Sequence, residues 1–146
     1  MLNRYFGEFP AGRVGWALLL LRVVTGVAMM QHGLGKIQAP FTWMNKNGPS
    51  PIPGFMQAIA AVSEFVGGAA LALGFLTPLA ALGIGGTMIG AILIAHRSDP
   101  WISGGGGKSW ELASLYLLTS AALLLSGPGR YSLDATIFKK RVRAEH

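Results

Sequence analysis

The chain has 146 residues, of which 51% are hydrophobic and only 12% are charged. A soluble domain carries about 25% charged residues, so this composition excludes a soluble globular protein with an ordinary polar surface. The net charge of +6 lies beside long apolar segments, which indicates membrane topology and contact with anionic lipid rather than nucleic-acid binding, and the absence of cysteine excludes disulfides and thiolate catalysis.

The first apolar segment covers residues 14–36 and begins beside Trp16, an aromatic residue of the kind found at membrane interfaces. The segment is too long for the core of a signal peptide, and no small-residue cleavage motif follows it, so we interpret it as a membrane span. Residues 37–54 are rich in proline, which forbids a continuous helix. We expect this loop to lie as a short flap on the membrane, with Phe41 and Trp43 at the interface.

Two further spans are expected at residues 55–75 and 79–97, joined by a tight turn at Thr77 and Pro78. Proline is well suited to the first turn of a helix, so Pro78 indicates where the third span starts. The next loop, residues 98–108, contains four consecutive glycines and is expected to form no regular element.

The fourth span is expected at residues 109–126, where Gly127, Pro128 and Gly129 stop it. The remaining tail, residues 130–146, is short and basic, and its sequence LDATIFKKRVR is typical of a short amphipathic helix.

The four segments are 18 to 23 residues long, close to the ~20 residues needed to cross a ~30 Å hydrocarbon core. The sequence therefore predicts an all-α integral membrane protein, a single four-helix bundle over residues 1–146. Cytoplasmic loops are enriched in Lys and Arg, so we expect both the N- and C-termini to be cytoplasmic, in a bacterial-type inner (plasma) membrane. Seven such residues flank that side (Arg4, Arg13, Arg130, Lys139, Lys140, Arg141 and Arg143) against four on the other (Lys36, Lys46, Arg97 and Lys108).

Glycines are placed where helices in a membrane approach each other. Gly86 and Gly90 form a small-xxx-small pair in the third span, while Gly67, Gly68 and Gly74 share a broad face of the second. Small residues let helix backbones come close in lipid, so these positions indicate helix contacts. The contacts belong either to a homodimer or to the interior of the bundle, and we favour the interior.

Two oppositely charged residues are expected deep in the membrane. Counting 1.5 Å per residue places Arg22 ~12 Å and Glu64 ~16–17 Å above the cytoplasmic edge. An unpaired charge at this depth costs several kcal/mol, so we predict a buried Arg22–Glu64 ion pair. The pair serves either as a clasp that sets helix register or as a proton or ligand site.

A second polar layer is expected near the outer face. His32, His96 and Glu111 fall at similar heights, ~26–27 Å above the cytoplasmic edge, with Lys36 nearby. The sequence therefore predicts an outer-facing polar pocket of His32, His96, Glu111 and Lys36, floored by the ion pair.

Three chemistries suit such a pocket. Two histidines on separate helices can ligate haem or, with Glu111, a divalent metal, and they can also exchange protons with a quinol. The spacing lacks the short-range histidine motifs of metal sites, so no metal site is expected, and quinone is favoured over haem. The alternative is that both histidines are polar caps at helix ends.

The order of these motifs resembles the DoxX family of small four-helix membrane proteins. The resemblance covers about residues 18–135 and rests on LLRVVTGVAMMQHGLGKI, on SEFVGGAALALGFLTPLAAL, on the histidine ending the third span, and on GPGRYSLD. By position, the family's polar residues fall on Arg22, His32, Glu64, His96 and Glu111.

The resemblance implies a membrane subunit of a quinone-linked redox or oxidative-stress system. The chain has no self-contained catalytic motif, so an oxidoreductase activity would be shared with a redox partner protein. Two alternatives stay open: a non-catalytic scaffold that docks a soluble partner through the basic tail or the proline-rich loop, and a pathway for a small solute or protons. The expected partners are the lipid bilayer, a protein partner and a second copy of the chain, and not nucleic acid.

Overall fold

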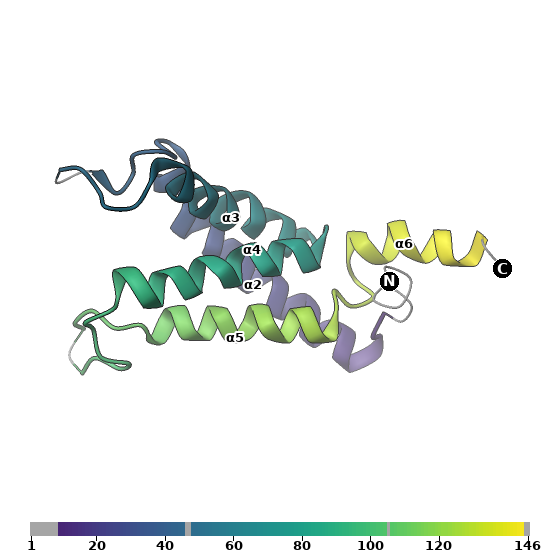
Figure 1. The fold of residues 1–146 in the computed structure, drawn as a ribbon. Helices are drawn as coiled ribbons and strands as arrows, with labels where there is room; N and C mark the ends of the chain where they lie inside the picture. Colours follow the sequence, from purple (N-terminus) through teal and green to yellow (C-terminus); the bar gives the residue numbers. More distant parts are fainter. Residues whose placement is uncertain (1–8, 46–47, 105, 145–146) are drawn as a thin grey trace.

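The computed structural model describes residues 9–45, 48–104 and 106–144, with side chains to residue 138, and Figure 1 shows their arrangement. These residues form helices joined by turns and loops, with no strand among them. The helical runs 12–37, 54–73, 77–95 and 111–126 correspond to the four predicted spans, with boundaries within two residues of the predicted ones. The helices are α2 (Gly12–Ile37), α3 (Gly54–Leu73), α4 (Thr77–Gly90), the π-helix η2 (Ala91–Ala95), α5 (Glu111–Ser126) and α6 (Leu133–Ala144).

The connections divide between the two ends of the bundle (Figure 1). The turn end holds the start of α2, the tight turn between α3 and α4, and the segment 127–132 that leads into α6. The loop end holds the two long connections, residues 38–53 and 96–110. Hydrogen bonds join the parts of the turn end, since the Arg130 amide donates to the Pro10 carbonyl at 2.9 Å and the Asp134 amide donates to the Gly74 carbonyl at 2.9 Å.

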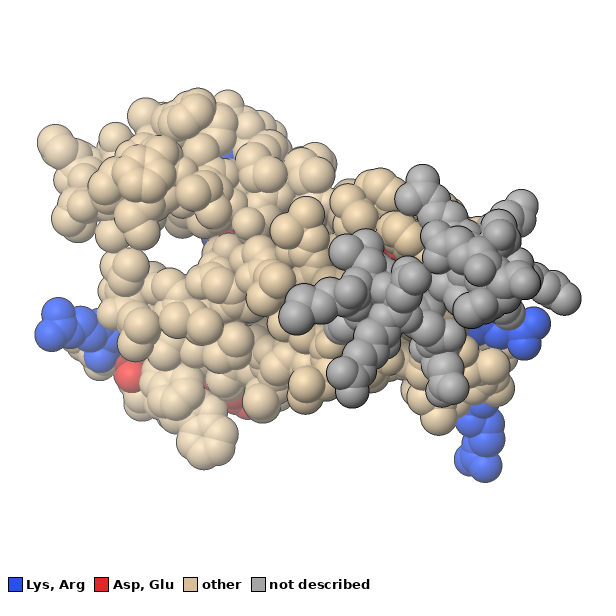
Figure 2. Space-filling model, turned by 45° about the vertical axis from the view of Figure 1, so that its right-hand side comes forward, with Lys and Arg blue, Asp and Glu red and all other residues tan. Residues whose placement is uncertain are grey.

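Among the described residues, three helices are long and apolar enough to cross a membrane: Gly12–Ile37, Gly54–Leu73 and the continuous run Thr77–Ala95. Helix α5 has 16 residues and rises ~24 Å, which is less than a ~30 Å hydrocarbon core. The view in Figure 2 shows charged side chains near the two ends of the molecule and a broad uncharged surface between them. The chain is thus an integral membrane protein with three long apolar helices and a fourth, shorter one.

Helices α2 and α3 are in backbone contact. A Cβ atom added to Gly26 would lie 2.5 Å from the Gly68 carbonyl oxygen, and one added to Gly68 would lie 2.7 Å from the Gly26 carbonyl oxygen. Hence Gly68 serves packing inside the bundle, as favoured from the sequence. The same contact sets the register between α2 and α3.

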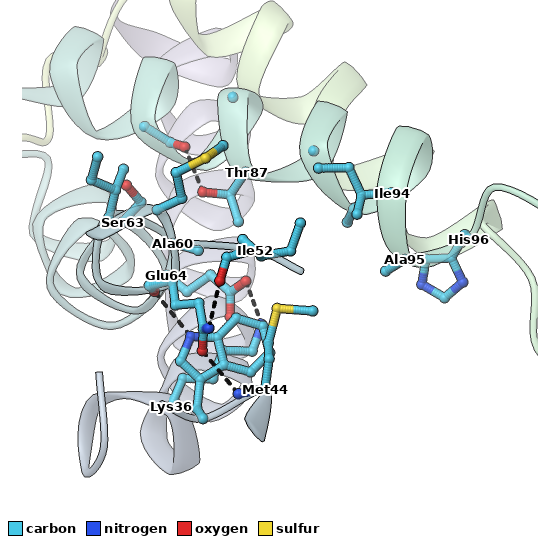
Figure 3. Close-up of a pocket in the computed structure, with 18 of the residues that line it drawn as sticks. Lys36, Met44, Ile52, Ala60, Ser63, Glu64, Thr87, Ile94, Ala95 and His96 are labelled. Atoms are coloured by element: carbon cyan, nitrogen blue, oxygen red, sulfur yellow. Dashed lines mark hydrogen bonds and ion pairs between the residues drawn. The ribbon is translucent and has the colours of Figure 1, made fainter. Parts of the chain in front are cut away.

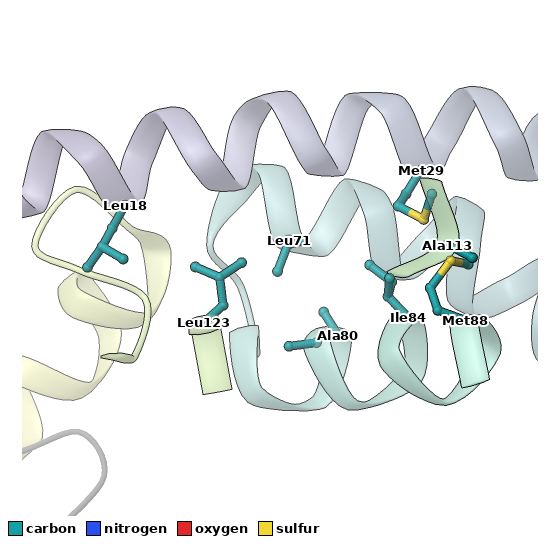
Figure 4. Close-up of a cluster of buried hydrophobic side chains, with 9 residues drawn as sticks. Leu18, Met29, Leu71, Ala80, Ile84, Met88, Ala113 and Leu123 are labelled. Carbon is teal, nitrogen blue, oxygen red and sulfur yellow. The ribbon is translucent and has the colours of Figure 1, made fainter. Parts of the chain in front are cut away.

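All four main helices contribute to one buried apolar cluster. Figure 4 shows Leu18 and Met29 of α2 facing Leu71 of α3, with residues of α4 and α5 completing the cluster. The buried members are Leu18, Met29, Leu71, Ala80, Ala81, Ile84, Met88, Ala113 and Leu123. The centre of the bundle is therefore filled, and space for a ligand lies toward the loop end.

Candidate functional site

A cavity of about 510 Å³ lies at the loop end, between α3 on one side and α4 with η2 on the other. Figure 3 shows Ala60, Ser63 and Glu64 on α3, with Thr87 and Ile94 across the opening. Part of the loop 38–53 also lines the cavity. The residues that line it are Lys36, Trp43, Met44, Ile52, Met56, Gln57, Ile59, Ala60, Ser63, Glu64, Leu82, Gly83, Gly86, Thr87, Gly90, Ala91, Ile94, Ala95 and His96.

An ion pair forms the main polar feature of this cavity. Lys36 Nζ lies 2.6 Å from Glu64 Oε1, and the Glu64 side chain is only 2% exposed. The same ammonium lies 4.6 Å from the centre of the Trp43 ring, within the range of a cation–π contact. Lys36 therefore ties the carboxylate on α3 to an aromatic residue of the loop.

The second oxygen of Glu64 is left without a donor. Oε2 is buried and has no hydrogen-bond partner among the described residues. A carboxylate can only accept hydrogen bonds, and an unsatisfied buried acceptor costs ~1–3 kcal/mol. Because Glu64 lines the cavity, the arrangement is suited to a ligand that donates a hydrogen bond to this oxygen.

Gln57 fixes the loop that covers the cavity. Its Oε1 accepts from the Met44 amide at 3.0 Å, its Nε2 donates to the Ile52 carbonyl at 2.9 Å, and its own carbonyl accepts from Trp43 Nε1 at 2.9 Å. Those three loop residues line the cavity. The predicted membrane flap is thus held over a cavity, where Trp43 faces inward while Phe41 remains 61% exposed.

The π-helix η2 supplies the far wall of the cavity. Ala91, Ile94 and Ala95 line it, and His96 follows directly. His96 Nδ1 lies 2.8 Å from Asp99 Oδ2, which orients the imidazole ring. Single π-turns within α-helices occur frequently at functional sites.

The structure brings together only part of the predicted pocket. His96 and Lys36 line the cavity, whereas His32 and Glu111 are not among its lining residues. His32 is exposed and packs edge-on against Tyr116 with ring centroids 5.8 Å apart, while Glu111 is exposed at the start of α5. Similar height in the membrane does not bring side chains together, because helices at one level present their residues in different directions.

The predicted Arg22–Glu64 ion pair is corrected by the structure. Glu64 pairs with Lys36, and Arg22 instead donates to the Tyr131 carbonyl at 2.5 Å and to the Leu71 carbonyl at 3.4 Å. The contact between α2 and α3 at Gly26 explains the difference, since it places Arg22 level with Leu71. Glu64 then lies about two helical turns farther toward the loop end.

Asp134 completes this buried cluster at the turn end. It is fully buried and accepts hydrogen bonds from the amides of Leu76 at 2.7 Å and Thr77 at 2.9 Å, so it caps α4, which has no side-chain cap of its own. Its negative charge also acts on Arg22. Asp134 belongs to the GPGRYSLD motif, for which no contact was predicted, because no local pattern indicates a contact with residues more than fifty positions away.

No group of three or more His, Asp or Glu residues is arranged to hold a metal ion within the part of the chain that the structure describes.

Comparison of the sequence with known protein families identifies the family of this chain. The DoxX family model matches residues 17–97, which include most of α2, all of α3, α4 and η2, and every residue that lines the cavity. The chain belongs to the DoxX family. Of the predicted pocket residues, His32, Lys36 and His96 lie within the matched region and Glu111 lies outside it.

This DoxX protein matches curated relatives over most of their length. One is the putative oxidoreductase CatD of Bacillus subtilis (strain 168), 34% identical over 121 residues, which cover 83% of this chain and 87% of the relative. Another is the inner membrane protein YqjF of Escherichia coli (strain K12), 28% identical over 124 residues, which cover 84% of this chain and 93% of the relative. No solved structure matches the chain.

Proposed function

We propose that this DoxX protein is an inner-membrane subunit of a redox system that binds a quinone-class molecule, in its hydroxyl-bearing quinol form, in the cavity between α3 and α4. The observation that carries the proposal is Glu64 Oε2, a buried acceptor without a donor on a residue that lines a largely apolar cavity. A quinol hydroxyl supplies that donor, whereas the oxidised quinone offers only acceptor oxygens.

The size and lining of the cavity support this proposal. Small-molecule sites usually have volumes of ~300–1,000 Å³, with apolar walls and a few polar groups that orient the ligand. The cavity of about 510 Å³ lies in that range, and its polar groups include Lys36, Glu64 and His96. The relative CatD is named a putative oxidoreductase, which agrees with a redox role.

The chemistry assigned to the site is positioning and proton exchange. Glu64 accepts the ligand's hydroxyl, Lys36 balances the carboxylate charge, and His96 exchanges protons near the loop end while Asp99 orients it. The chain has no cysteine, so no thiol can carry electrons. The proposal therefore assigns the electron acceptor to a partner protein.

The test measures ligand binding to purified protein in lipid nanodiscs. A decyl-substituted benzoquinol and the matching quinone are titrated while Trp43 fluorescence is followed, with Trp43→Phe identifying the signal. We expect the quinol to bind more tightly, and Glu64→Gln to weaken quinol binding about 10- to 100-fold, the value of a charge-assisted hydrogen bond of ~1.5–3 kcal/mol.

Glu111→Gln is the matched control, because Glu111 is an exposed glutamate outside the cavity lining and should leave binding unchanged. Equal losses in both variants would refute the assignment of Glu64. No binding by wild type would instead favour the scaffold or the solute pathway. A partner lost on deletion of residues 139–143 would then support the scaffold.

The proposed orientation places the turn end in the cytoplasm and the loop end outside. Since the sequence contains no cysteine, single substitutions report topology directly. In intact spheroplasts, we expect a membrane-impermeant maleimide to label Ser103→Cys at the loop end but not Thr136→Cys, which is on the exposed side of α6. The reverse pattern would overturn the orientation.

A further inference from the structure

The cavity opens sideways toward the lipid. Ile59 of α3, Leu82 of α4 and Ile94 of η2 all line it. These three residues are also 61%, 59% and 48% exposed. Exposed isoleucine and leucine on a membrane helix face hydrocarbon, so the gap between α3 and α4 joins the cavity to the bilayer.

Glycines on α4 keep this gap open. Gly83, Gly86 and Gly90 line the cavity at helical spacing, on one face of α4. A Cβ atom on Gly86 or on Gly90 would meet nothing within 4 Å, in contrast to Gly68, whose added Cβ would contact α2. These two glycines therefore do not serve packing inside the bundle, and they leave a groove along α4.

A second observation indicates that the space is for a ligand. Glu64 lines the same cavity from α3, is 2% exposed, and presents the buried Oε2 atom that lacks a donor. The site thus combines one polar group that needs a partner with an apolar groove that leads to lipid. Molecules with a hydroxyl-bearing head and a hydrocarbon tail match this combination.

We propose that the groove along Gly86 and Gly90 holds the hydrocarbon tail of the ligand, so that the site takes a membrane-dissolved, long-tailed amphiphile from the bilayer. This inference rests on the proposed function, in which the head of the same ligand donates to Glu64. The head lies between Lys36 and the loop that Gln57 anchors, and the tail leaves between α3 and α4.

The test measures the contributions of the ligand's head and of its hydrocarbon tail to binding separately. Two benzoquinols with the same head are compared in nanodiscs, one decyl-substituted and one methyl-substituted. We expect Gly86→Leu to raise the Kd of the decyl compound at least 10-fold and to change the Kd of the methyl compound less than twofold. Partition of the decyl compound into lipid is the same for wild type and variant, so it cancels from this comparison.

Two further variants serve as a control and as a repeat of this test. Ala122→Leu adds three carbon atoms, one fewer than Gly86→Leu, on the exposed face of α5 outside the cavity lining, and should change neither Kd. Gly90→Leu repeats the test one turn farther along the groove, in case the first variant does not assemble.

The outcomes distinguish the two proposals. If Gly86→Leu weakens both compounds equally, or neither, the tail groove is wrong while quinol binding stands. If the variant turns a dimer into a monomer and leaves both Kd values unchanged, the glycines form an interface between two copies and the tail groove is wrong. If wild type binds neither compound, the proposed function fails and the tail groove with it.

Discussion

Replacing Arg22 by Met measures how much the contacts of its buried charge contribute to stability. Arg22 is fully buried and donates to the carbonyls of Tyr131 and Leu71, and the charge of Asp134 acts on it. Methionine fills similar apolar volume, so the loss is mainly electrostatic. Hydrogen bonds from a charged group contribute ~1.5–3 kcal/mol each, and removing one partner of a buried charge cluster costs ~3–5 kcal/mol. We expect the free energy of unfolding to fall by about 3–5 kcal/mol.

A double-mutant cycle identifies the partner. Unfolding is measured in mixed micelles by SDS titration for Arg22→Met, for Asp134→Asn and for the double variant. Residues in one charge network couple by ~0.5–3 kcal/mol, so we expect coupling of about 1–3 kcal/mol between these two sites. The matched cycle of Arg22→Met with Glu64→Gln should be additive within ~0.5 kcal/mol, because Glu64 pairs with Lys36 instead.

Coupling of Arg22 to Glu64 that exceeds its coupling to Asp134 would refute the assignment of Asp134 as its partner. Such a result would restore the Arg22–Glu64 pair expected from the sequence and would contradict the register between α2 and α3. Equal and negligible coupling in both cycles would mean that Arg22 is held by the carbonyl groups alone.

Three smaller substitutions test the packing of α2 against α3, the anchoring of the loop over the cavity and the capping of α6. Gly26→Ala should lower the free energy of unfolding by ~1–3 kcal/mol, because its Cβ would lie 2.5 Å from a carbonyl oxygen of α3, while Gly86→Ala, with open space around it, should be neutral in the same SDS titration. Gln57→Leu should free the loop over the cavity and raise acrylamide quenching of Trp43, and unchanged quenching would refute its anchoring role. Ser132→Ala should cost about 1 kcal/mol in unfolding, because the Ser132 hydroxyl accepts from the Ala135 amide at the start of α6.

Helix positions were largely predictable from the sequence, because long apolar runs and their glycine and proline stops are local signals. The second span ends at Gly74, which adopts the left-handed conformation with φ of 66°. Pro78 then lies in the first turn of α4, as predicted. The fourth helix starts two residues later than predicted, at Glu111, and its 16 residues are fewer than the 19 of the continuous run Thr77–Ala95.

Side-chain partners were less predictable, because they depend on register and on direction. Depths counted from assumed membrane edges put Arg22 and Glu64 at one level, but the glycine contact between α2 and α3 shifts the register. Equal depth also grouped His32 with His96, although only His96 lines the cavity. Tyr131 contributes a backbone carbonyl to Arg22 from 109 residues away, a contact that no sequence pattern reveals.

The buried charges at the two ends of the bundle differ in what surrounds them, and this difference decides which end is assigned a ligand. At the turn end, Arg22 donates to carbonyls of the chain itself and Asp134 accepts from two amides, so the cluster joins helices. Arg22 Nε also lacks a partner, yet Arg22 is not among the residues that line the cavity.

At the loop end, Glu64 is held by Lys36 through one oxygen only, and its other oxygen is buried and unpaired, on a residue that lines the cavity. A cluster that only stabilised the fold would gain from a donor at that oxygen, and Ser63 and Thr87 line the same cavity without supplying one. The unpaired acceptor therefore costs stability that a bound donor restores, as expected of a site that selects its ligand by a single hydrogen bond.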